Sequence, residues 1–87
     1  MPGDPSDGVV VYGTTWCAQT MRVRRFLERN EIAYQFVDVE ADQAAANQVR
    51  WWTGGFVSTP TIYINGQILV EPQMPELEDA LVANGLV

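Results

Sequence analysis

Residues 61–70 read Thr-Ile-Tyr-Ile-Asn-Gly-Gln-Ile-Leu-Val, and this stretch predicts a β-hairpin. Two runs rich in apolar and β-branched residues flank Asn65-Gly66, a dipeptide that strongly favours a two-residue type I′ turn. Because such a turn reverses the chain at once, residues 61–64 and 67–70 are expected to pair as antiparallel strands.

Two helices are expected before the hairpin. Thr14 and Thr15 offer N-cap hydroxyls for a helix over about residues 16–30. Asp42 can cap a second helix over residues 43–53. Spacings of three and four residues give each helix one inner side, formed by Thr20, Val23, Phe26 and Leu27 in the first and by Ala45, Val49 and Trp52 in the second.

Further strands are expected over residues 9–12 and 34–39, and a third helix over residues 76–83. The element order is then β-α-β-α-β-β-α. The first two strands are joined through a helix, so they should be parallel with a right-handed crossover. We expect an α/β domain over residues 9–87, a four-stranded mixed sheet flanked by three helices, after a flexible polar tail at residues 1–8.

Composition excludes several classes of function. The 87 residues include 11 acidic and 5 basic side chains, and the net charge is −6, which argues against nucleic acid or an anionic membrane as partner. There is no histidine, hence no Cys–His dyad and no His-bound metal. Residues 1–8 lack the pattern of a secretory signal and the lone Cys17 suits a reducing compartment, so a cytoplasmic protein is expected.

The basic residues are concentrated in one segment. All five are arginines, and Arg22, Arg24, Arg25 and Arg29 lie close together in the first predicted helix. One interpretation is a solvated helix face. The other is a positive field near Cys17 that favours a thiolate or an anionic partner.

Cys17 is the candidate nucleophile. It falls in the first turn of the first predicted helix, where unpaired N–H groups and the helix dipole stabilise an anion. Its pKa is therefore expected to fall from about 8.5 into the range of roughly 3.5–7.5 that is typical of reactive cysteines. Thr20 lies over the same turn, and its hydroxyl can donate to the sulfur. The alternative is that Cys17 is a small buried apolar residue.

Ser58-Thr59-Pro60 stands directly before the hairpin. A proline at the start of a strand is ordinary, because it has no N–H to donate to the sheet. The functional alternative is a cis Thr59–Pro60 bond that presents the backbone of Thr59 to an extended ligand, although only about 5–6% of X–Pro bonds are cis.

Two adjacent tryptophans end the second predicted helix. Trp52 follows Val49 at helical spacing and is expected in the core. Trp51 points about 100° away. We expect it to be exposed beside Trp16, where the pair would form an apolar rim around the sulfur.

Over nearly all of residues 9–87 the chain resembles the glutaredoxin family of the thioredoxin-like fold, and in particular its short bacterial, mycoredoxin-like members. The motifs that carry the resemblance are Thr14-Thr-Trp-Cys17, Val37-Asp-Val-Glu40, Gly54-Gly55 and Ser58-Thr-Pro60. The resemblance implies a thiol–disulfide oxidoreductase that acts in cell redox homeostasis.

The resemblance also implies roles for single residues. Cys17 matches the nucleophile, and Trp16 matches the aromatic residue before it. Pro60 matches the cis proline, and Thr59 matches the residue whose backbone pairs with the bound thiol substrate. Ser58 takes the place of the usual threonine. Together with Thr15 of the first motif and the exposed Trp51, these residues form the expected substrate-binding set.

Departures from the family pattern narrow the mechanism. Thr20 stands where dithiol members have a second cysteine, so Cys17 is expected to become thiolated and to be released by an external small thiol. Thr14 replaces a lysine of glutathione-using members, and Glu71 would repel a carboxylate-bearing ligand. Glutathione is therefore the least expected of the small-thiol co-substrates, mycothiol, bacillithiol or a protein thiol stay open, and no tightly bound cofactor is expected.

The expected function is thus reduction of protein mixed disulfides by a monomer, with small thiols and disulfide-containing proteins as partners. Two alternatives stay open. One is an iron–sulfur cluster carrier, a dimer bridged through Cys17, although this chain lacks the Cys-Gly-Phe-Ser motif. The other is a redox-inactive binding module with the same fold.

Overall fold

The expected hairpin is present in the computed structural model, which describes residues 8–86. Strand β3 (Thr61–Ile64) pairs antiparallel with β4 (Gln67–Val70), with Ile64 opposite Gln67. Asn65 and Gly66 have φ angles of 47° and 95°, as a type I′ turn requires. The predicted tail lies outside the described residues except for Gly8.

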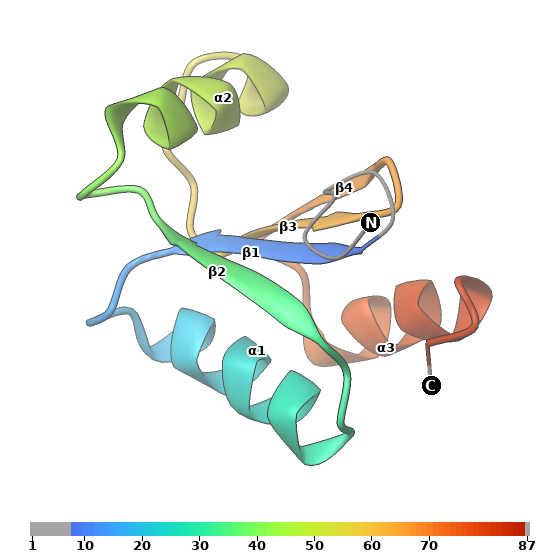
Figure 1. Ribbon diagram of the computed structural model, residues 1–87. Coiled ribbons are helices and arrows are strands. Elements are labelled where there is room, and N and C mark those ends of the chain that lie inside the picture. The colour runs from blue at the N-terminus through green and yellow to red at the C-terminus, as the bar shows by residue number, and fades with distance from the viewer. Residues whose placement is uncertain (1–7, 87) are drawn as a thin grey trace.

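Strand β1 (Val9–Gly13) lies inside the sheet, between β2 (Tyr34–Asp38) and β3. It pairs parallel with β2 and antiparallel with β3, so the strand order is β2-β1-β3-β4 (Figure 1). The predicted mixed sheet and the order β-α-β-α-β-β-α are confirmed. The C-terminal end of β1 and the first residue of β3 therefore lie side by side at the same end of the sheet.

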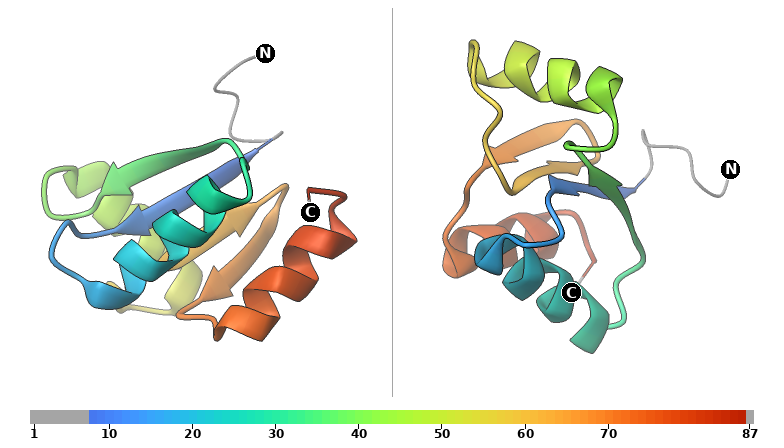
Figure 2. Two further views of the ribbon diagram at one scale, coloured as in Figure 1. Left: turned by 90° about the horizontal axis from the view of Figure 1, so that it is seen from below. Right: turned by 90° about the vertical axis from the view of Figure 1, so that its left-hand side faces the viewer.

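Three helices cover the two faces of the sheet. Helices α1 (Ala18–Arg29) and α3 (Met74–Ala83) lie on one face and α2 (Gln43–Thr53) on the other (Figures 1 and 2). Leu27 of α1 and Leu77 and Leu81 of α3 are fully buried in the larger core cluster. No helix in residues 8–86 is both long and apolar enough to cross a membrane.

The start of α1 differs from the prediction. The helix begins at Ala18, because Cys17 has an extended backbone (φ −80°, ψ 121°) and serves as the N-cap residue. Neither Thr14 nor Thr15 caps the helix, since both precede this extended residue and Thr14 is turned into the interior. Smaller boundary differences place the start of α3 at Met74 and the end of β2 at Asp38.

The inner helix faces are close to those expected. Phe26 is only partly buried against the core that α1 covers, whereas the other predicted inner residues of α1 are buried. Trp52 is also partly buried. Its ring lies edge-on to Tyr12 at 5.3 Å and stacks on Tyr63 at 5.9 Å, so it belongs to an aromatic row on the α2 face of the sheet.

The Asp42 cap gives a direct test of how α2 is held. Asp42 Oδ1 accepts a hydrogen bond from the N–H of Ala45 at 3.0 Å. Replacing Asp42 by Ala should lower the free energy of unfolding by about 1 kcal/mol in urea denaturation, because one N–H at the helix start loses its partner. D42N keeps an acceptor and should stay near wild type. Equal losses in the two variants would contradict the capping role.

Candidate functional site

Cys17 lies where the chain passes from β1 into α1. It is a free thiol of intermediate exposure, not a buried core residue. Its carbonyl accepts from the N–H of Met21 at 3.0 Å, which closes the first turn of α1. The sulfur is thus held at the N-terminal end of a helix and is reachable from solvent.

The surroundings of the sulfur favour its ionised form. Partial burial raises the pKa of Cys17, but the hydroxyl groups of Thr20 and Thr59 and the backbone N–H groups of Thr20 and Gln19 outweigh it. The pKa therefore lies below its ordinary value. All of these groups are neutral dipoles and none is an arginine, so the proposed positive field is not what lowers this pKa.

Thr20 is completely buried beneath the sulfur. Its Oγ1 has no hydrogen-bond partner among the described residues, so the predicted bond to Cys17 is not formed in this state. The hydroxyl nevertheless lies close enough to the sulfur to stabilise the thiolate by hydrogen bonding, which lowers the pKa of Cys17. A buried hydroxyl without a partner costs about 1–3 kcal/mol, a cost that a thiolate acceptor would relieve.

Gly13 is a site residue that sequence reasoning missed. A Cβ atom built on Gly13 would lie 2.5 Å from both Cγ2 and Oγ1 of Thr20. The last residue of β1 must therefore lack a side chain for the first turn of α1 to pack here. The signal in the sequence was only a glycine at the end of a strand, which is also typical of an ordinary turn.

The loop before β3 brings its residues to Cys17 from 42 positions away. The Thr59–Pro60 peptide bond is cis, as the functional alternative required. Thr59 Oγ1 donates a long hydrogen bond of 3.9 Å to Cys17 Sγ. The loop is anchored on both sides of this contact, because Thr61 Oγ1 donates to the Ser58 carbonyl at 2.7 Å and the Glu71 N–H donates to the Pro60 carbonyl at 2.9 Å.

Trp16 projects into solvent beside the nucleophile. Its side chain is 70% exposed, and Nε1 donates to Glu40 Oε1 at 2.8 Å. The N–H of Glu40 in turn donates to Asp38 Oδ1 at 2.9 Å, which shapes the turn after β2. Glu40 is a second residue whose role was missed, because its partner lies 24 residues away in sequence.

The remaining predicted binding residues are less closely tied to the sulfur. Trp51 is exposed as expected, at 83%, but within residues 8–86 it makes no ring contact with Trp16. Thr15 is exposed and has no side-chain hydrogen bond to any described residue. Phe56, which was not predicted as a site residue, is 72% exposed in the loop that leads to Pro60.

The described residues contain no cluster of three or more metal-ligating side chains.

The pairing of a helix-start cysteine with a cis-proline loop has a counterpart among known proteins. The family model for glutaredoxin matches residues 9–69. The chain belongs to the glutaredoxin family. A protein of Mycobacterium tuberculosis strain H37Rv that is provisionally named a glutaredoxin is 36% identical over 75 residues, covering 85% of this chain and 89% of the relative. Membership supports thiol–disulfide oxidoreductase chemistry for this glutaredoxin.

Solved structures agree with this assignment. The thioredoxin-like protein BC3987 is 33% identical, covers 84% of this glutaredoxin and 99% of its own chain, and superposes with a TM-score of 0.75. The glutaredoxin from Archaeoglobus fulgidus has a TM-score of 0.76 at 16% identity, with 86% of both chains covered. At that identity the likeness concerns the fold alone.

The two hydroxyl groups next to the sulfur give a testable pH dependence. The rate of Cys17 alkylation by iodoacetamide should rise as the pH passes through the folded-state pKa, with a midpoint below the value of about 8.5 for a free cysteine. T20V and T59V should each move this midpoint upward, so that less of the thiol is ionised and the alkylation rate at neutral pH falls. T20S and T59S keep the hydroxyl and should stay near wild type. An unmoved midpoint in both valine variants would contradict the proposed stabilisation.

The contact between Gly13 and Thr20 gives a second prediction. G13A should lower the free energy of unfolding by about 1–3 kcal/mol, because the added methyl group overpacks the interface. T20A removes Cγ2 and Oγ1, the two atoms nearest to the added methyl group, so in G13A/T20A the effect of G13A should largely disappear. The free energies of unfolding are measured by urea denaturation. If the loss in G13A/T20A equals the sum of the losses in the two single variants, the two residues do not interact sterically.

Proposed function

We propose that this glutaredoxin reduces mixed disulfides between proteins and a small thiol by a monothiol mechanism. The observation that carries the proposal is the position of Cys17. Its sulfur is partly exposed at the start of α1, has a lowered pKa and faces Thr59 of the cis-proline loop. It is also the only cysteine in the chain, and Thr20 beneath it cannot form a disulfide.

The cycle needs two exchange steps. The Cys17 thiolate attacks the small-thiol sulfur of the mixed disulfide, so that a bond from Cys17 to the small thiol forms and the protein leaves as a thiolate that takes up a proton. A second small thiol, as its thiolate, then attacks the thiolated Cys17. This step forms the symmetric small-molecule disulfide and returns the Cys17 thiolate. Overall, one mixed disulfide and one small thiol give one protein thiol and one symmetric disulfide.

The cis-proline loop supports the positioning of the substrate. Within the described residues neither the N–H nor the carbonyl of Thr59 is hydrogen-bonded to the protein. An extended substrate can therefore pair with both groups while its disulfide lies against Cys17. The exposed rings of Trp16 and Phe56 supply apolar surface near this path.

The charges near the site favour mycothiol, which has no carboxylate group, over glutathione and bacillithiol, which both carry carboxylates, as the small thiol. Thr14 is buried and uncharged at the position where a lysine would hold a carboxylate. Glu71 adds an exposed negative charge directly after β4. Both features weaken the binding of a ligand that depends on its carboxylates.

The proposal predicts turnover that depends on one sulfur. A peptide carrying a cysteine in disulfide linkage with mycothiol, bacillithiol or glutathione is incubated with the protein and the matching free thiol. We expect peptide reduction and, before free thiol is added, an adduct of the small thiol on Cys17 in the intact mass spectrum. C17S should abolish both signals, because its hydroxyl is not ionised at neutral pH.

T20C serves as the matched control. It places a second thiol one helical turn from Cys17, so the adduct should resolve into an internal disulfide instead of persisting. Absence of both adduct and turnover with all three thiols, in a protein that is folded by circular dichroism, would overturn the proposal. That outcome would favour a binding module without redox turnover.

A further inference from the structure

The solvent-facing side of α1 carries a row of three arginines. Arg22, Arg25 and Arg29 are all exposed. Because they are spaced by three and four residues, their side chains leave the helix within about 60° of one another. We call Arg22, Arg25 and Arg29 the arginine row.

The fold does not use these three side chains. The neighbouring Arg24 has a structural role, because its guanidinium lies 4.0 Å over the Phe36 ring and its Nε donates to the Tyr34 hydroxyl at 3.1 Å. Glu28 on the same helix keeps its negative charge and offsets part of the row, but its carboxylate is oriented toward Tyr34, from which it accepts a hydrogen bond, and it forms no ion pair with the row. Within residues 8–86 the arginine row has no hydrogen bond or ion pair, so its charge is presented to solvent.

The row begins close to the nucleophile. Helix α1 starts directly after Cys17 and rises about 1.5 Å per residue, which places the three arginines about 8 to 18 Å from Cys17 along the helix axis. A typical protein partner covers about 800 Å² on each side of an interface. A protein whose disulfide reaches Cys17 can therefore contact the row at the same time.

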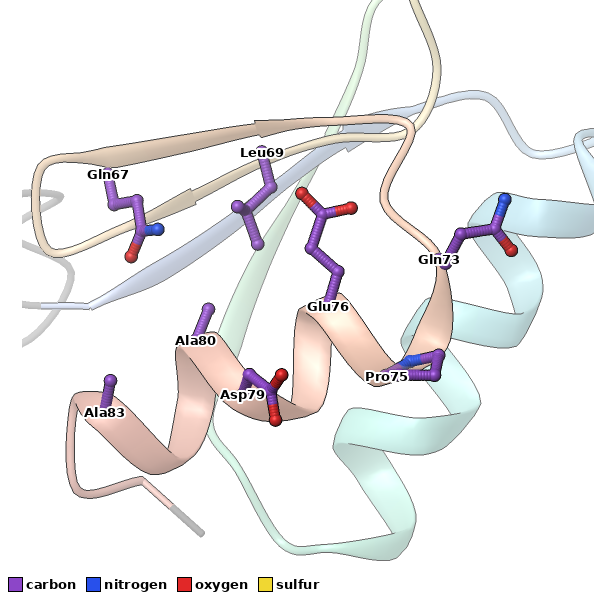
Figure 3. A pocket seen from close by; sticks show the side chains of 8 residues that line it. All are labelled: Gln67, Leu69, Gln73, Pro75, Glu76, Asp79, Ala80 and Ala83. Carbon is purple, nitrogen blue, oxygen red and sulfur yellow. The ribbon is translucent and has the colours of Figure 1, made fainter.

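Most charged residues outside the arginine row are acidic. The net charge is −6, and no basic residue follows Arg50. On the same face of the sheet as α1, a groove between β4 and α3 is lined by Glu76 and Asp79 (Figure 3). An acidic partner is repelled at this groove and attracted at the arginine row, so the charge pattern selects one orientation of binding.

We propose that the arginine row is the docking surface for protein substrates that carry acidic residues next to their disulfide. This inference rests on the proposed function, because it assigns the class of substrate that Cys17 reduces. The row raises the rate of productive encounter and sets the orientation of the substrate. The exchange chemistry at Cys17 is unchanged, and a small neutral disulfide gains nothing from the row.

The test compares three disulfide substrates at low and at physiological salt. Two are peptides linked through one cysteine to the small thiol, with four glutamates or four lysines at positions three to six from the cysteine. At about 3.3 Å per extended residue these charges reach the span of the row. The third is a small neutral disulfide. The row variant R22Q/R25Q/R29Q is compared with Q43E/Q48E/R50Q, which changes the net charge by the same amount on α2, beyond the opposite face of the sheet.

We expect the row variant to lose about tenfold in kcat/KM for the acidic peptide at low salt, through slower encounter. Its kcat/KM for the neutral disulfide should stay within about twofold of wild type, and so should the α2 variant on all substrates. The preference of the wild type for the acidic peptide should shrink as salt rises.

Three outcomes would overturn the inference. They are equal losses in the two variants, an unchanged acidic-peptide rate in the row variant, and row-dependent binding of a DNA oligonucleotide or an anionic vesicle without any preference between the peptides. Failure of the proposed function looks different, because the wild type would then leave all three disulfides unreduced, including the neutral one.

Discussion

The close packing of Thr20 against Gly13 determines where the reactive sulfur lies. With no side chain at the end of β1, the first turn of α1 can pack directly against the sheet, and a Cβ would come within 2.5 Å of Thr20. Cys17 is then the last extended residue before the helix, so its sulfur faces the N–H groups of the first turn. The cis-proline loop reaches the same point because β3 starts beside the end of β1. Geometry at a glycine therefore controls the chemistry of a residue four positions away.

The site is activated without any formal positive charge. The chain contains no histidine, and no arginine contributes to the lowered pKa of Cys17. Hydroxyl and backbone dipoles supply the stabilisation, in a place where only partial burial opposes them. Dipoles fixed by the fold act over short distances and are little affected by salt, in contrast to exposed charges. No arginine is needed to stabilise the thiolate, so the arginine row on α1 is available to bind an acidic partner.

Much of this structure could be predicted from local signals. The hairpin followed from Asn65-Gly66, and the cap of α2 followed from Asp42, because each acts within a few residues of its partner. The predicted start of α1 was wrong by two residues. Threonine hydroxyls can cap a helix, but their presence at Thr14 and Thr15 does not show at which residue the helix begins. The tie between Trp16 and Glu40 and the packing at Gly13 depend on the completed sheet, so no pattern along the chain could indicate them.

The hydrogen bond from the Trp16 indole to Glu40 joins the loop after β1 to the turn after β2. The N–H of Glu40 donates in turn to the carboxylate of Asp38, the last residue of β2. Two successive hydrogen bonds therefore connect the indole to the end of this strand. A bulky ligand that displaces the Trp16 ring must first break the hydrogen bond between the indole and Glu40. Access to the sulfur from the Trp16 side therefore depends on one exposed side-chain hydrogen bond, whereas the proline loop on the other side is held at two backbone carbonyls.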